Sequence, residues 1–189
     1  MLSSLLPTLL LPLVLANPLH TARATSLGAV TQFVYSGSGC TQGSNSVAVS
    51  STSTGYTVQV YTFDEFTTSD TQNCELHFQG SGLSAGWQVS LTEFDAVGSA
   101  KGAVSAVWWF WQAYWSDDAA DTLTLSGAIE NPAGTSLVKA NVTEPLWSQC
   151  IGASGNPGIL NVNFRVVVTG EGSFEVDKEM LKYQFRRCQ

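Results

Sequence analysis

Apolar and polar residues alternate with a period of two along most of the chain after residue 28. Successive side chains of a β-strand point to opposite faces, so this alternation predicts strands that each bury one face. Five segments show the pattern most clearly: 56–60, 75–79, 87–91, 122–126 and 160–168. In the longest of these, Asn161, Asn163 and Arg165 face away from the apolar side. The sequence therefore predicts an all-β protein.

Short glycine-rich stretches separate these segments and predict turns between strands. They lie at 36–39, 80–86, 131–134, 152–158 and 170–172. The 189 residues suit a single domain. About eight to ten strands without a long helical pattern predict a single β-sandwich, with the jelly roll as one variant.

The apolar residues of the last segment change parity, from Phe174 and Val176 to Leu181 and Tyr183. A β-bulge within 177–179 would return both pairs to one buried face, because a bulge adds one residue to a strand. A short helix at the same place is the alternative.

The run Leu5–Ala16 is apolar and uncharged, as in the central region of a secretory signal peptide. No Lys or Arg precedes it, but Val14 and Ala16 are small residues suited to a cleavage site. We expect a signal peptide over 1–16, a propeptide or flexible segment over 17–28, and the β-sandwich domain over 29–189. No later apolar run is long enough to span a membrane as a helix.

Four cysteines, Cys40, Cys74, Cys150 and Cys188, all lie outside the expected signal peptide. An even number in a secreted chain predicts two disulfides, for which the spacing alone allows three connectivities. The segment from Asn141 to Thr143 is a glycosylation sequon, so a used Asn141 would lie at the surface. We therefore expect a secreted, extracellular glycoprotein.

Charge and motifs exclude several functional classes. The formal net charge is −7, and the few basic residues are scattered apart from Arg186 and Arg187, which argues against nucleic-acid binding. No C-x-x-C pair is present, and His77 is the only histidine well inside the domain, which argues against zinc. No nucleotide-binding loop and no nucleophile elbow is present, so we expect no cofactor.

Two acidic pairs are candidates for catalytic groups, because many glycan hydrolases use two carboxylates. One pair is Asp64 with Glu65, and another is Glu93 with Asp95. Glu93 and Asp95 share the parity of the apolar Leu91, which would turn them toward the interior or a groove. Strand ends often carry such acids, so no catalytic residue is predicted.

Two further polar features have simple structural interpretations. His77 lies within a strand on its polar face and has no specific partner in the sequence. Asp117, Asp118 and Asp121 follow the aromatic run, but their spacing lacks the ligands of a calcium loop, and a solvated turn is expected.

The stretch "VWWFWQAYW", from Val107 to Trp115, contains four of the six tryptophans. As a strand it would turn its odd positions to one face and its even positions to the other. Gln112 marks the even face as the solvent side, which predicts Trp109 and Trp111 in the core. The even face then supplies a candidate ligand surface made of Trp108, Phe110 and Tyr114.

The contexts of the cysteines resemble a known family. They are "GSGC" at 37–40, "NCELH" at 73–77, "WSQC" at 147–150, "GILNVNFRV" at 158–166 and "FRRC" at 185–188. In this order they resemble the secreted, mostly fungal proteins called domain of unknown function 4360. The family usually has proline after the first cysteine, where Thr41 stands, and tryptophan where Phe185 stands. The resemblance implies a β-rich four-cysteine domain without established activity, with disulfides Cys40–Cys74 and Cys150–Cys188.

The leading interpretation is a non-enzymatic extracellular protein, effector-like, that binds cell-wall glycan or a host protein. The alternative is a carbohydrate-binding module with an aromatic platform. A glycan hydrolase using Glu93 and Asp95 is the third interpretation. Nothing in the sequence predicts the oligomeric state.

Overall fold

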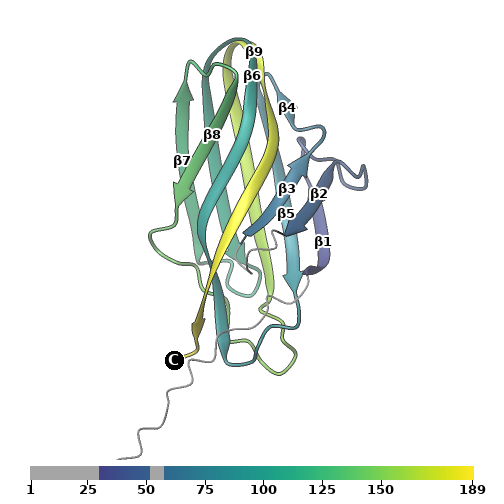
Figure 1. Cartoon of the computed structure of the whole chain (residues 1–189), viewed down its shortest axis with the longest axis vertical. Helices are drawn as coiled ribbons and strands as arrows, with labels where there is room; N and C mark the ends of the chain where they lie inside the picture. The colour runs from purple at the N-terminus through teal and green to yellow at the C-terminus, as the bar shows by residue number, and fades with distance from the viewer. Residues whose placement is uncertain (1–29, 52–57) are drawn as a thin grey trace, which may run out of the picture.

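The computed structural model describes residues 30–51 and 58–189, and Figure 1 shows their arrangement. The expected signal peptide and the whole of the segment 17–28 lie outside the described residues, as do residue 29 of the expected domain and the start of the predicted strand 56–60. The described part of the chain contains no helix. Its strands are β1 (Val30–Ser36), β2 (Val47–Ser51), β3 (Val58–Phe63), β4 (Thr67–Thr68), β5 (Thr71–Gly80), β6 (Trp87–Trp115), β7 (Thr122–Glu130), β8 (Thr135–Asn141) and β9 (Ile159–Arg187).

Two very long strands organise the fold. β6 and β9 each span 29 residues and pair antiparallel over almost their whole length, from Trp87–Arg187 to Trp115–Leu160. The paired ribbon turns over at the top of Figure 1, so its two halves lie in different layers. Each half is the centre of one sheet, and the all-β sandwich predicted from the alternation is confirmed.

The first sheet has the order β1-β5-β9-β6-β7, and uses the first half of β9 and the second half of β6. The second sheet has the order β2-β3-β9-β6-β8, and uses the other two halves. The short β4 pairs with β9 at the turn of the ribbon. Figure 1 shows the second sheet in front of the first.

The glycine-rich stretch 170–172 was expected to be a turn, and this prediction is wrong. β9 continues through it, paired with β6 so that Gly172 lies opposite Gly102. Gly102 and Gly170 have positive φ values of 81° and 103°, a region that favours glycine. At Gly170 a Cβ would also meet the backbone of Ala103 and Ser105. These glycines therefore bend the ribbon between the two sheets without interrupting it.

The predicted β-bulge in the last segment is confirmed. Val97 pairs with Lys178 and Gly98 with Val176, which leaves Asp177 without a partner residue in the ladder. The extra residue restores one inward face for the apolar residues on both sides, as expected from their change of parity. It also turns Glu179 inward, where the residue is completely buried.

Aromatic side chains from both sheets fill the core. Trp111 is fully buried and stacks against Phe164, with ring centroids 4.8 Å apart, and against Phe94 at 5.2 Å. Trp109 packs on Trp111 at 5.1 Å. Burying rings of this size contributes much of the hydrophobic stabilisation of a small domain.

The two disulfides join cysteines in sequence order, as the family resemblance implied. Cys40–Cys74 links the loop after β1 to β5, and Cys150–Cys188 links the loop after β8 to the end of β9. Two such bridges fit an extracellular protein. None of the described residues forms a helix that is long and apolar enough to cross a membrane.

Candidate ligand-binding face

The tryptophan-rich run divides its side chains between core and surface. Val107, Trp109, Trp111, Ala113 and Trp115 are all buried, which confirms the predicted core face. On the opposite side Trp108 is 44% exposed, while Phe110 and Tyr114 are half-buried. The three candidate ligand residues therefore lie together on the outer side of the first sheet.

The strand register gives the composition of the part of this side that lies on β7, β6, β9 and β5, beside the edge strand β1 with Val34. We call it the outer face, and it consists of side chains from the four adjacent strands β7, β6, β9 and β5. In that strand order its rows are Ala128, Trp108, Val167 and Thr71; Ser126, Phe110, Arg165 and Asn73; Thr124, Gln112, Asn163 and Glu75; and Thr122, Tyr114, Asn161 and His77. Aromatic side chains on β6 thus lie beside amides and a guanidinium on β9.

One half of the outer face is held by its own hydrogen bonds. Asn161 donates through Nδ2 to Ser116 Oγ at 2.8 Å, and its Oδ1 lies 2.6 Å from Nδ1 of His77. The Tyr114 hydroxyl donates to Glu75 at 3.2 Å. Burial and the neighbouring Glu75 carboxylate raise the pKa of Tyr114. The polar groups of this half are therefore largely satisfied, and His77, expected at the polar face of its strand, is anchored by Asn161.

The other half contains polar side chains without partners, and we call it the open half. It comprises Trp108, Phe110 and Gln112 of β6, Asn163 and Arg165 of β9, Asn73 of β5 and Thr124 of β7. The side chains of Gln112, Asn163 and Arg165 make no hydrogen bond or ion pair with any described residue. The Arg165 guanidinium carbon lies 4.5 Å from the centre of the Phe110 ring. Together with neighbouring residues they line a shallow hollow of about 340 Å³, whose lining residues are Asn73, Phe110, Gln112, Thr124, Asn163 and Arg165.

The acidic pair Glu93 and Asp95 lies on the other sheet and faces away from the core. Of the two orientations inferred from parity, the interior or a groove, the interior one is wrong. The register of β6 shifts between Leu91 and Glu93, so Thr92 is an extra residue. This bulge reverses the parity beyond it, and Phe94 points into the core instead. The interior orientation followed from the parity of Leu91, which does not hold beyond the bulge, where the buried apolar positions change to Phe94 and Ala96.

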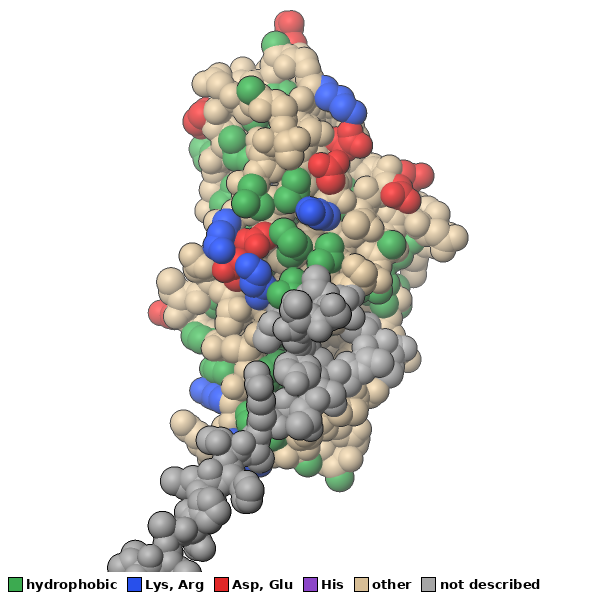
Figure 2. Space-filling model, viewed as in Figure 1, with side chains coloured by type: hydrophobic (Ala, Val, Ile, Leu, Met, Phe, Trp, Pro, Cys, Tyr) green, Lys and Arg blue, Asp and Glu red, His purple; other side chains and the backbone are tan. Residues whose placement is uncertain are grey.

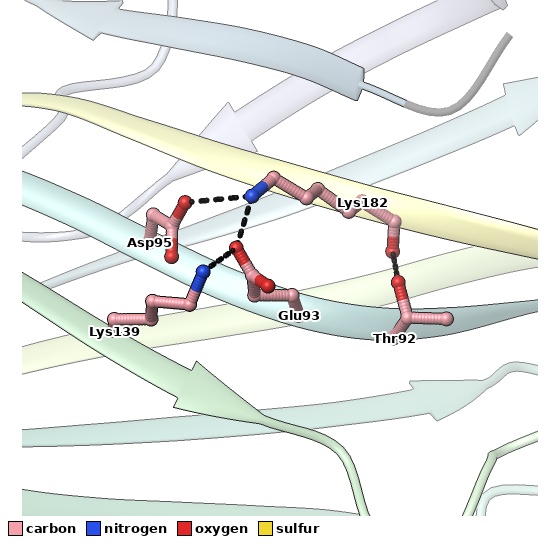
Figure 3. Close-up of polar contacts among 5 residues, drawn as sticks. All are labelled: Thr92, Glu93, Asp95, Lys139 and Lys182. Atoms are coloured by element: carbon pink, nitrogen blue, oxygen red, sulfur yellow. Dashed lines mark hydrogen bonds and ion pairs between the residues drawn. The ribbon is translucent and has the colours of Figure 1, made fainter.

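Lysines neutralise this acidic pair, as Figure 3 shows. Glu93 contacts Lys139 at 2.8 Å and also Lys182, whose Nζ lies 3.2 Å from Asp95 Oδ2. Burial raises the pKa of Glu93, but the hydrogen bonds from Lys139 and Lys182 outweigh it and lower the pKa to about 2. Burial raises the pKa of Asp95 against the opposing effect of Lys182. Figure 2 shows the face of this second sheet, where acidic and basic side chains gather among apolar ones.

The other residues considered from the sequence are dispersed. Asp64 and Glu65 are exposed between β3 and β4. The three acids Asp117, Asp118 and Asp121 are exposed in the turn after β6, as expected for a solvated turn. Within residues 30–51 and 58–189, no group of three or more His, Cys, Asp or Glu side chains is arranged to hold a metal ion. Asn141 is exposed at the end of β8, on the second sheet.

Sequence reasoning identified the aromatic residues of the open half but not its polar ones. Asn163 and Arg165 were placed on the solvent side of their strand, yet nothing linked them to Phe110. The link is the register in which Arg165 lies opposite Phe110 and also opposite Asn73. Long-range pairing of this kind has no local signal in the sequence.

Comparison with known proteins adds a family and a group of similar structures. No curated protein sequence matches the chain. One similar structure is TmCBM61 in complex with β-1,4-galactotriose, with a TM-score of 0.35, 11% identity, and coverage of 85% of this chain and 91% of that one. Another comes from carbohydrate-binding modules of the β-sandwich superfamily with promiscuous specificity, with a TM-score of 0.35, 14% identity, and coverage of 87% and 62%.

A third similar structure is the enzymatically active domain of tailspike protein 4 of bacteriophage CBA120. Its TM-score is 0.26 and its identity 11%, with coverage of 84% of this chain and 20% of the other. Similarity at these levels transfers neither a residue nor a ligand. The model of the family described as "Domain of unknown function (DUF4360)" matches residues 28–188, which include both disulfides and the whole outer face. The chain belongs to the DUF4360 family.

Proposed function

We propose that this protein is a secreted glycan-binding protein that holds carbohydrate on the open half of the outer face. The observation that carries the proposal is the exposed Trp108 beside a hollow into which unpartnered polar side chains project. Sugar rings combine a C–H-rich face, which packs on aromatic rings, with hydroxyls at the edge, which need hydrogen-bond partners. The open half offers both kinds of contact.

The polar groups match the hydroxyls of a sugar. Gln112 and Asn163 lie opposite each other on β6 and β9, and each amide can both donate and accept. Neither is engaged by a described residue, so a ligand would not have to break existing bonds. Their strands belong to a sheet fixed by the core, which favours a preformed site.

A hydrolytic function has less support. The ammonium of Lys182 contacts both Glu93 and Asp95 and lies between the two carboxylates, while Lys139 also contacts Glu93. A glycosidic bond would have to occupy that space. We therefore propose that the protein binds glycan without cleaving it.

A host protein is the other partner considered from the sequence, and the open half suits it less well. Protein interfaces rely on several aromatic or aliphatic anchors at their centre. Here Trp108 is the most exposed aromatic of the face, and the hollow beside it is lined mainly by amides, Thr124 and Arg165.

Secretion agrees with the same proposal. The two disulfides suit an oxidising compartment, and the apolar run before Ala16 is expected to be a signal peptide. If Asn141 is glycosylated, its glycan would project from β8 of the second sheet. The outer face of the first sheet would remain free.

The test is binding of the purified protein to a panel of cell-wall polysaccharides by affinity electrophoresis and calorimetry. Trp108→Ala is expected to weaken binding about tenfold or more, as for a central aromatic anchor. The matched control is Leu137→Ala, which removes an apolar side chain that is 61% exposed on the second sheet. Wild-type affinity in Trp108→Ala, or loss in Leu137→Ala alone, would show that the proposed face is wrong.

A further inference from the structure

We infer that the glycan held by the open half is acidic, and that Arg165 binds the carboxylate of a uronic acid residue. This inference rests on the proposed function and names the class of its ligand. It follows from the state of Arg165, from its neighbours, and from the position of the nearest acid on the same face.

Arg165 is a cation without a counter-ion. No carboxylate of a described residue lies within ion-pair distance of it, and it donates no hydrogen bond to one. Lys139 and Lys182 of the second sheet differ, because both of them contact Glu93. An exposed guanidinium that is neither paired nor hydrogen-bonded by the protein is available to a ligand.

The ring of Phe110 orients this guanidinium. The carbon Cζ lies 4.5 Å from the ring centre, a distance at which cation–π attraction operates. Stacking on a ring leaves the N–H groups at the guanidinium edge free. A carboxylate accepts two of them in parallel, which gives the bidentate geometry that arginine favours.

Neighbouring amides extend the recognition beyond one ion pair. Asn73 lies directly opposite Arg165 on β5, and Asn163 and Gln112 lie one row further along the sheet. All of them line the same hollow as Arg165. They can therefore bind the ring hydroxyls next to a carboxylate that is held by the guanidinium.

The position of Glu75 makes the two ends of the outer face differ in charge. It is opposite Asn163, in the row next to Arg165, and accepts a hydrogen bond from Tyr114. A ligand carboxylate beside Tyr114 would meet this charge directly, whereas one at Arg165 would lie one row away from it and against a cation. The outer face therefore favours a ligand carboxylate at Arg165 over one at Tyr114.

The experiment compares three probes with the full-length protein by calorimetry: oligogalacturonate, its methyl ester, and a neutral β-1,4-galactan oligosaccharide. We expect the wild type to bind oligogalacturonate about tenfold or more tightly than its ester, with an advantage that decreases as salt is added. Arg165→Gln should remove this preference, so that oligogalacturonate binds no more tightly than its methyl ester. Arg165→Lys should retain part of it, since the charge remains but the planar fork is lost.

The outcomes separate the inference from the proposed function. Equal affinity for the acid and its ester, abolished in both cases by Trp108→Ala, would overturn the acidic ligand and leave glycan binding intact. A preference for the acid that persists in Arg165→Gln would also overturn the inference. Absence of binding to every glycan, with the thermal unfolding of the wild type normal, would overturn both.

Discussion

The indole N–H of Trp111 donates a hydrogen bond of 2.8 Å to Oε1 of Glu179, and both side chains are fully buried. Trp111 belongs to the first sheet and Glu179 to the second, so this bond joins the sheets across the core. The other oxygen, Oε2, is buried without a hydrogen-bond partner among the described residues. Burial raises the pKa of Glu179 to about 8, against the opposing effect of the Trp111 hydrogen bond.

The free energy of unfolding should therefore depend on pH through Glu179. The pKa of Glu179 is higher in the folded than in the unfolded chain. Its contribution to the free energy of unfolding is therefore complete below about pH 4.5 and is lost as the pH rises toward 8. Glu179→Gln keeps an acceptor for Trp111 and removes the titration. In denaturant unfolding from pH 4 to 9, the free energy of unfolding of the variant should increase relative to that of the wild type as the pH rises. A difference between the two that does not change with pH would contradict the raised pKa of Glu179.

Trp111→Ala should destabilise the protein without testing ligand binding. The substitution removes a ring that stacks on Phe94 and Phe164 and leaves Glu179 without its donor. We expect a loss of about 3–5 kcal/mol in the free energy of unfolding, measured with denaturant. Trp108→Ala is the matched control on the opposite face of the same strand, and it should cost less than about 1 kcal/mol. Equal losses in the two variants would mean that the faces of β6 are misassigned.

Lys182 should matter more for stability than Lys139, although both contact Glu93. Lys182 also contacts Asp95, a buried residue whose Oδ1 has no hydrogen-bond partner among the described residues. Lys182→Met would leave Asp95 without a cation, at a cost of about 1–3 kcal/mol. Lys139→Met should have a smaller effect, because Lys139 is more exposed and Glu93 keeps Lys182. The reverse order in thermal unfolding would contradict the role given to Lys182.

Gly127 should not tolerate a side chain. A Cβ at this position of β7 would overlap the indole of Trp109, which lies across the glycine. Gly127→Ala is expected to cost about 1–3 kcal/mol through displacement of the buried ring. Gly152→Ala is the control, since no atom lies within 4 Å of the Cβ that would be added there. A neutral Gly127→Ala would show that Trp109 can adopt another position.

The sequence predicted individual strands well and their continuity poorly. Alternation assigns each side chain to a face, so the core positions of Trp109 and Trp111 were predictable. The parity of Leu91 misplaced Glu93 and Asp95, because the apolar positions change parity between Leu91 and Phe94, where the bulge at Thr92 lies. The stretch 170–172 looked like a turn, since glycine permits both a turn and a bend within a paired ribbon.

The candidate site was only partly predictable for a similar reason. Trp108 and Phe110 stood out by composition, but the open half also needs Arg165 and Asn163 from a strand about 50 residues further along the chain. Their proximity depends on the register of β9 against β6, which is set by packing of the whole core. The burial of Glu179 was not predicted either, although the bulge that turns it inward was expected.

The most direct measurement is a titration of the protein with oligogalacturonate, followed through the tryptophan indole N–H resonances in NMR spectra. We expect the resonance of Trp108 to shift as ligand is added, while that of Trp111, held by Glu179 in the core, stays in place. The shift should be reduced in Arg165→Gln. A binding isotherm in which Trp108 does not respond would contradict a ligand site on the open half.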